Sequence, residues 1–160
     1  MGLKNELIPY RRKEKWGFCD FNKQIKIECL YDDVRTYAEE MAAVLLDEKW
    51  GFIDKDGNQV IPCIYDSVSN FNEGLARVKF NDKFSFINRQ GKRVIACKYD
   101  TGSNQEEYGF EFLYTPIYGK FIEGMCLIKQ AGKYGLLNIK GSLTTPCIYD
   151  GISKFYQISG

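Results

Sequence analysis

Short alternating runs of apolar and polar residues follow one another along the whole chain. The clearest copy is residues 74–80, the polar pair Asn81-Asp82 and residues 83–87, and two alternating runs joined by two polar residues predict a β-hairpin. A third run, typified by residues 59–65, follows a turn that contains Asp56-Gly57. No stretch has the periodicity of an amphipathic helix of useful length. The pattern therefore predicts an all-β fold built from three short strands at a time.

The alternation also predicts which side chains are buried. In the first strand Ala76, Val78 and Phe80 share one face, and we expect that face to point inward. The middle strand is apolar on both sides, so we expect it to be covered on both faces. Pro62 in the third strand lacks an N–H, which predicts a strand at the edge of its sheet or bent at that point.

The run of three strands repeats along the chain. The first landmark is Lys15-Trp16-Gly17-Phe18 and its counterparts, which begin at Lys49, Lys83 and Lys133, so the steps are 34, 34 and 50 residues. A second landmark keeps these steps and ends in Tyr31-Asp32, Tyr65-Asp66, Tyr99-Asp100 and Tyr149-Asp150. We infer one domain over residues 1–160 with four units at about 3–36, 37–70, 71–120 and 121–154. The long third step places an insertion within residues 101–120.

A single three-stranded unit cannot bury both of its faces, so neighbouring units must form the core together. We expect four stacked β-meanders in an elongated, twisted, solenoid-like domain. The alternative is a small closed ring that resembles a propeller. Gly17, Gly51 and Gly135 share a position with Ser85, and a small residue there predicts that a ring or a backbone segment comes close.

The landmarks closely resemble the WG-repeat (KWG repeat) family, named for the pairs Trp16-Gly17 and Trp50-Gly51. The second copy follows the pattern almost throughout. The other copies depart from it at Phe84-Ser85, at Tyr134 and at Glu40, where the later copies carry Gly74 and Gly124. The resemblance implies a β-rich repeat fold, found mostly in bacteria and used as a binding module. It brings no catalytic residues to transfer.

Composition narrows the classes of function. The 22 Lys and Arg residues nearly balance the 21 Asp and Glu residues, for a net charge of +1. A nearly neutral chain attracts phosphate groups only weakly, so the protein is not expected to bind nucleic acid. It is rich in aromatic residues (15%) and contains no His, the commonest general base and metal ligand. No apolar run approaches the roughly 20 residues of a membrane span, and residues 1–10 do not resemble a signal peptide. We expect a cytoplasmic protein without a membrane partner.

The six cysteines could suggest a metal site or disulfides, but no C-x-x-C motif is present. Each cysteine lies in a column that is apolar in other copies or that belongs to the buried face. We therefore expect buried free thiols, no metal, no cofactor and no disulfide-linked partner. The repeated Tyr-Asp pairs are interpreted as scaffold, with Asp binding the backbone of the turn that follows. No catalytic residue is expected.

The insertion is the non-repeated feature and hence the first candidate for binding. It carries alternating rings at Tyr108, Phe110, Phe112 and Tyr114, which predict a strand with one aromatic face. This strand could anchor a partner or merely patch the stack. The candidate partner-binding residues are Tyr108, Phe110, Phe112, Tyr114, Tyr118, Arg11 and Arg12.

The predicted function is a non-enzymatic protein-binding module or adaptor that could regulate or inhibit its protein partner. The alternative is carbohydrate or cell-wall binding through the repeated aromatic residues. That alternative needs exposed rings at Trp16, Trp50, Phe84 and Tyr134, whereas the repeat pattern predicts that these rings are largely buried.

Overall fold

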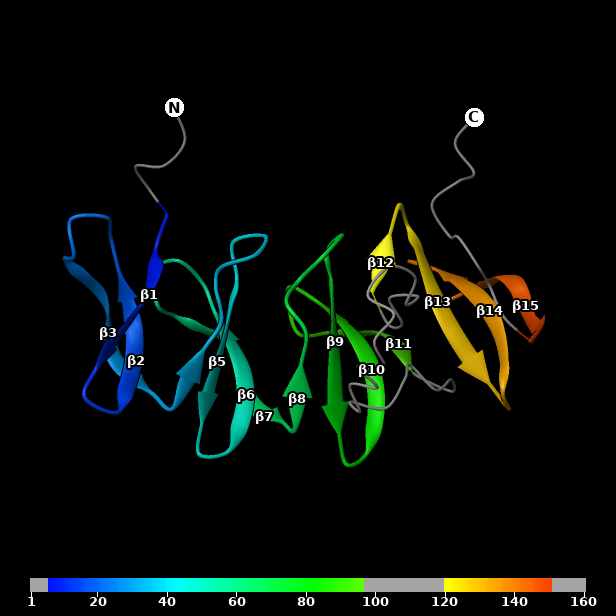
Figure 1. Cartoon of the computed structure of the whole chain (residues 1–160), viewed down its shortest axis with the longest axis horizontal. Helices are drawn as coiled ribbons and strands as arrows, with labels where there is room; N and C mark the ends of the chain where they lie inside the picture. Colours follow the sequence, from blue (N-terminus) through cyan, green and yellow to red (C-terminus); the bar gives the residue numbers. More distant parts are fainter. Residues whose placement is uncertain (1–5, 97–119, 151–160) are drawn as a thin grey trace, which may run out of the picture. The chain divides into compact units, whose positions relative to one another are not determined.

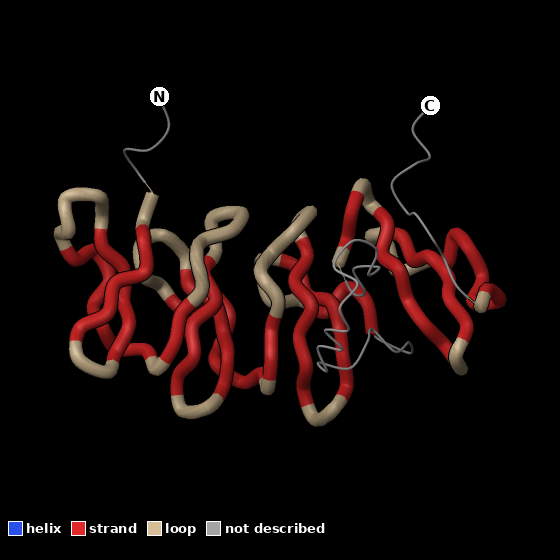
Figure 2. The backbone as a smooth tube through the Cα atoms, in the orientation of Figure 1, coloured by secondary structure: helices blue, strands red, loops and turns tan. Residues whose placement is uncertain are grey.

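The computed structural model describes residues 6–96 and 120–150, and this part of the chain consists of strands and turns without a helix (Figures 1 and 2). The chain forms two compact units, residues 1–93 and 94–160. The boundary between these units falls inside a strand.

Four sheets are present in the described residues, and each follows the order of the chain (Figure 1). Their orders are β1-β2-β3, β4-β5-β6-β7, β8-β9-β10-β11 and β12-β13-β14-β15. The strand bounds are β1 Ile8–Arg12, β2 Lys15–Cys19, β3 Ile25–Tyr31, β4 Asp33–Val34, β5 Ala42–Leu46, β6 Lys49–Ile53, β7 Gln59–Tyr65, β8 Ser67–Val68, β9 Leu75–Phe80, β10 Lys83–Asn88, β11 Arg93–Ala96, β12 Phe121–Ile122, β13 Met125–Gln130, β14 Lys133–Asn138 and β15 Leu143–Tyr149. The all-β prediction is confirmed, and none of these sheets closes into a barrel.

The predicted hairpins are present. β9 and β10 pair antiparallel and are joined by Asn81 and Asp82, whose φ angles are 49° and 60°. Asp47 and Glu48 join β5 to β6 in the same way, with φ of 50° and 63°. Two successive residues with positive φ form the turn whose twist matches that of paired strands.

Three of the four sheets contain one strand more than the sequence predicted. β4 pairs with β5, β8 pairs with β9, and β12 pairs with β13. The Asp32 N–H donates to the Leu45 carbonyl at 2.9 Å, and the Asp66 N–H donates to the Lys79 carbonyl at 2.8 Å. The segment after each of these Tyr-Asp pairs therefore crosses to the sheet of the next repeat. The prediction of three strands per sheet was incomplete because a two-residue strand is too short to show a period.

The third strand of a repeat lies at the edge of its sheet and is irregular, as Pro62 indicated. The register between β6 and β7 shifts between Trp50 and Phe52. At this shift a Cβ on Gly51 would lie 2.5 Å from the Ile61 carbonyl oxygen. A Cβ on Gly17 would lie 2.3 Å from the Ile27 carbonyl oxygen. The prediction that this position must be small because another backbone comes close is confirmed.

The core of residues 1–93 lies between successive sheets. One cluster joins the first two sheets: Phe18, Ile27, Ala42, Val44 and Ile53. A second cluster joins the second and third sheets: Met41, Ala43, Phe52, Ile61, Val68, Phe71, Ala76, Val78 and Ile87. Phe52 and Ile53 are neighbours in β6 but belong to different clusters, so the middle strand is covered on both faces as predicted.

Aromatic pairs recur in this core. The Phe18 and Tyr37 rings meet edge to face with centroids 4.9 Å apart, and Phe52 and Phe71 repeat the arrangement at 4.8 Å. Each pair links the middle strand of one repeat to the start of the next, and such pairs add to the free energy of burial. Within residues 1–93 the repeats therefore stack in chain order.

One first-strand residue does not follow the predicted pattern. Ala76 and Val78 are buried, whereas Phe80 is exposed at the end of β9 and its ring meets that of Tyr65, with the ring centroids 6.3 Å apart. The alternation holds from Ala76 to Lys79 and ends at Phe80, next to the hairpin turn of the same repeat, while Leu75 at the start of the strand is buried as well as Ala76.

Residues 94–160 contain the sheet of β12 to β15 and a core of their own. Its buried side chains are Ile95, Phe121, Cys126, Leu127, Ile128 and Leu137. A Cβ on Gly141 would lie 3.2 Å from the Ile95 side chain. Gly57 makes the same contact with Ile27 in the other unit, at 3.3 Å. In both units a turn glycine packs on the third-strand isoleucine of the preceding repeat.

Candidate interaction surface

The predicted binding residues fall into two groups. Arg11 and Arg12 are exposed on β1. The second group is the aromatic residues of the insertion, Tyr108, Phe110, Phe112, Tyr114 and Tyr118, which lie outside the described residues. Cys97, Tyr99 and Asp100 also lie outside the described residues. The binding role of both groups stays a prediction.

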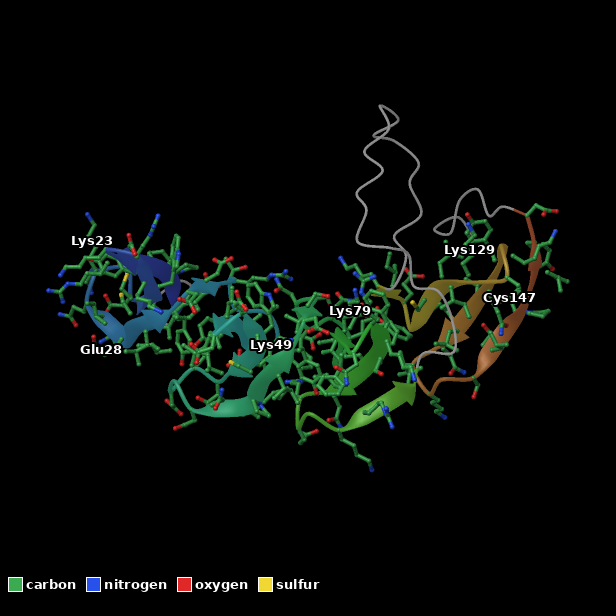
Figure 3. The ribbon with its side chains drawn as sticks, turned by 90° about the horizontal axis from the view of Figure 1, so that it is seen from below. Lys23, Glu28, Lys49, Lys79, Lys129 and Cys147 are labelled. Carbon is green, nitrogen blue, oxygen red and sulfur yellow. The ribbon has the colours of Figure 1, made fainter. Side chains whose placement is uncertain are left out.

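The aromatic column of the WG landmark is half-buried, and each of its rings has a cation over it. Lys79 and Lys129, labelled in Figure 3, lie over Phe84 and Tyr134 at 5.9 and 5.1 Å from the ring centroids. The other such contacts are Arg11 over Trp16 at 5.7 Å, Arg35 over Trp50 at 4.8 Å and Arg77 over Phe84 at 5.2 Å. These cation–π contacts occupy the ring faces on which a sugar would stack, so the carbohydrate alternative gains no support from them.

Arg35 was not singled out by the sequence and holds two repeats together. It is half-buried, its guanidinium stacks on Trp50, and it donates to the Val68 carbonyl at 2.7 Å. Burial lowers the pKa of Arg35, but a guanidinium keeps its charge in proteins. The position carries Ser69 in the next repeat, so no repeated signal marked it.

The Asp of each described Tyr-Asp pair forms an ion pair with the lysine of its own WG landmark (Lys49 is labelled in Figure 3). Lys15 and Asp32 are 2.5 Å apart, as are Lys49 and Asp66. Lys133 pairs with Asp150 in the same way.

The second oxygen of these carboxylates reaches the next repeat. Asp32 accepts from the Asp47 N–H and Asp66 from the Asn81 N–H, both at 3.1 Å. The contact with Lys15, and to a smaller extent the Asp47 N–H, lowers the pKa of Asp32 below its usual range. Lys49 lowers the pKa of Asp66 in the same way. The turn lies 15 residues onward, not directly after the Asp as expected. Each carboxylate therefore links its own repeat to the next one, and we call this double contact an Asp staple.

Another column, which holds Asp or Asn, closes a loop in every repeat and was not predicted from the sequence. Oδ1 of Asp54 accepts from the N–H groups of Asp56 and Asn58 at 3.0 and 2.8 Å. Asp20, Asn88 and Asn138 make the same pair of hydrogen bonds. The signal was visible as an Asp or Asn five residues after each landmark lysine, which is typical of side chains that bind backbone in turns.

No disulfide joins the described cysteines. Cys19 and Cys126 are buried as expected, whereas Cys29, Cys63 and Cys147 are only half-buried. The Cys63 thiol donates weakly to the Val44 carbonyl at 3.8 Å. Burial raises the pKa of Cys19, Cys63 and Cys147, which disfavours the reactive thiolate. Within residues 6–96 and 120–150, no three His, Cys, Asp or Glu side chains could share a metal ion.

The third strands present apolar side chains to solvent. Leu30 on β3 is 61% exposed, Val60 and Ile64 on β7 are 40% and 42% exposed, and Ile148 on β15 is 61% exposed. We call Leu30, Val60 and Ile64, which all lie in residues 1–93, the outer row, and Ile148 is the equivalent of Leu30 and Ile64 in the other unit. They alternate with inward residues such as Ile27 and Ile61, and their strands lie at sheet edges. An edge strand offers unpaired backbone groups to a further strand, so exposed apolar side chains on it are candidates for contact with another chain.

The pattern of the WG containing repeat family matches residues 16–50, 50–84, 84–104 and 134–157. Because these matches cover well over half of the chain, the protein belongs to the WG containing repeat family. The break between the third and fourth matches, residues 105–133, overlaps most of the window 101–120 in which the insertion was predicted. No curated protein and no solved structure matches the chain. The described residues contain no helix of the length and apolarity needed to cross a membrane.

Proposed function

We propose that this protein is a non-enzymatic protein-binding module that contacts its partner through the outer row. The observation that carries the proposal is the exposure of Leu30, Val60 and Ile64 on the edge strands of residues 1–93. Burial of such side chains supplies about 25 cal/mol per Å² of apolar surface. A partner with apolar side chains on an extended segment fits this surface, because an edge strand offers backbone groups as well.

The chemistry of the described polar residues favours binding over catalysis. Asp32 and Asp66 are engaged by lysines and turn N–H groups, and burial disfavours ionisation of the Cys63 thiol. The free thiols suit a reducing compartment, in keeping with a cytoplasmic location. Regulation or inhibition of the partner stays a prediction.

Charge substitutions in the outer row test the proposal. The double variant Leu30→Lys, Ile64→Lys is compared with the wild type in affinity capture from native lysate, with retained proteins identified by mass spectrometry. Phe21→Lys is the matched control, because Phe21 is an exposed apolar residue outside the row. Surface changes of this kind shift stability by about 0.5 kcal/mol or less, so the thermal midpoint should hold in all three proteins.

We expect the double variant to lose proteins that the wild type and Phe21→Lys both retain. If the wild type retains no protein above a blank resin, the binding role is wrong. If the double variant retains the same proteins as the wild type, the outer row is not the contact surface. Deletion of residues 102–118 then tests the insertion, which the sequence predicted as the anchor.

A further inference from the structure

The first strand of the first repeat presents a face that the later repeats bury. Ile8 is 37% exposed, whereas the residues in the same place of the other first strands, Ala42, Ala76 and Cys126, are fully buried. Tyr10 is half-buried, and its counterparts Val44, Val78 and Ile128 are buried. In residues 1–93 that face of the second and third repeats is covered by the sheet before it.

The outer edge of β1 is also free of a strand in the described residues. β1 ends its sheet, whereas β5 and β9 are flanked by β4 and β8. The carbonyls of Ala43 and Leu45 accept from Arg35 and Asp32 across that edge. By the strand register, Pro9 and Arg11 of β1 are the counterparts of Ala43 and Leu45 of β5.

The last repeat presents the opposite face. Tyr149 is 46% exposed, whereas Tyr31 and Tyr65 are half-buried. Leu136 and Thr145 are half-buried, whereas residues in their two columns are buried in earlier repeats: Phe18, Phe52, Phe86, Ile27, Ile61 and Ile95. This exposure is specific to the last sheet, unlike that of Ile148, which matches the exposure of Leu30.

The hydrogen bonds of Asp150 also indicate that the last repeat presents an uncovered surface. Asp150 pairs with Lys133, as Asp32 does with Lys15. Among the described residues, however, no hairpin-turn N–H donates to Asp150, whose side chain is 88% exposed. The turn position that donates to Asp32 is Asp47, and its counterpart beside β1 is Lys13.

We propose that the β14–β15 face of one copy of this chain docks on the β1 face and edge of a second copy. The contact repeats the packing that already joins repeats within residues 1–93. Tyr149 and Leu136 cover Ile8 and Tyr10, and Asp150 accepts from the Lys13 N–H and donates its own N–H to the Arg11 carbonyl. The two surfaces differ, so the contact is head-to-tail. It is independent of the outer row and goes beyond the proposed function.

The first test is the mass of the intact 160-residue chain, measured by sedimentation velocity and light scattering over a concentration series. We expect the weight-average mass to rise with concentration above that of one chain. Ile8→Lys blocks the β1 surface and Tyr149→Lys blocks the β15 surface, and each variant alone should keep the mass of one chain. Phe21→Lys is the matched control and should associate like the wild type, because Phe21 is an exposed apolar residue that lies outside both surfaces and outside the outer row.

The decisive test is a mixture of the two blocked variants. Each keeps one intact surface of opposite kind, so an equimolar mixture should reach the mass of two chains and stop there. Asp150→Lys serves as a second tail variant with the same expected result, and circular dichroism confirms that each variant is folded. A wild type that keeps the mass of one chain at every concentration overturns the proposal. So does association that survives both substitutions, or a mixture that stays at the mass of one chain.

Discussion

At the scale of single residues, turn positions with a positive φ determine how much backbone strain each repeat contains. Gly57, Gly91 and Gly141 occupy one of these positions with φ of 84°, 75° and 82°. In the first repeat the position holds Lys23 with φ of 62°, although the pair Asn22-Lys23 suggested Asn as the more tolerant residue. The position is fixed by the loop that Asp20 closes with the Gln24 N–H. The fold therefore imposes an unfavourable backbone on a lysine.

Lys23→Gly should raise the stability of the protein. Removal of the Cβ relieves about 1–2 kcal/mol of strain in the left-handed backbone of the folded state. The greater conformational freedom of glycine in the unfolded chain offsets about 0.4–1 kcal/mol of this gain in stability. The net gain expected in urea unfolding is about 0.5–1 kcal/mol. Lys23→Ala is the control: it removes the charge but keeps the Cβ, so no gain is expected. An equal gain in both variants would mean that charge rather than backbone strain is relieved.

At the scale of the elements, a repeated small residue is strong evidence for a backbone contact. The glycine column predicted a close approach, and Gly51 faces the Ile61 carbonyl. Pro62 predicted that β7 is an edge strand or is bent, and β7 lies at the edge of its sheet with shifts in its register. β4, β8 and β12 were not predicted because a two-residue strand has no periodicity of its own. The pairing of β4 and β8 depends in addition on the next repeat. The exposure of the outer row could be inferred from the alternation along the third strand, but the sequence drew attention to the insertion instead.

The Asp staples between repeats should make stability depend on pH at the acid end. Lys49 and the Asn81 N–H favour the ionised form and hold the pKa of Asp66 below its usual range. A lowered pKa in the folded state means that the carboxylate stabilises the fold at neutral pH. This contribution is lost as the pH falls from about 4 through the lowered pKa.

Asp66→Asn should therefore lower the thermal midpoint at pH 7. The difference from the wild type should shrink below about pH 4 and vanish once the wild-type carboxyl is protonated. Asp82→Asn is the control, because Asp82 pairs with Lys79 at 3.0 Å with its side chain 94% exposed, and such pairs contribute little. A midpoint difference for Asp66→Asn that is the same at every pH would show that the staple acts through shape rather than charge.

At the scale of the whole molecule, the chain combines repeated packing with two compact units, residues 1–93 and 94–160. In repeat proteins each unit is stabilised by itself and by its nearest neighbours, so opening can be local. Ile61 is buried between the second and third sheets of the first unit, and Ile128 is buried in the second unit. The two positions allow the same substitution to be made in each unit.

Ile61→Val and Ile128→Val should each cost about 0.5–1.5 kcal/mol through the lost methylene and the cavity it leaves. If the units open separately, hydrogen exchange in Ile61→Val should accelerate in β6 and β9, while β13 and β14 keep their wild-type protection. Ile128→Val should show the reverse, with β13 and β14 affected. A loss of about 1 kcal/mol corresponds to roughly fivefold faster exchange, which mass spectrometry resolves peptide by peptide. Acceleration of both units by either substitution would show that the repeats unfold as one cooperative body.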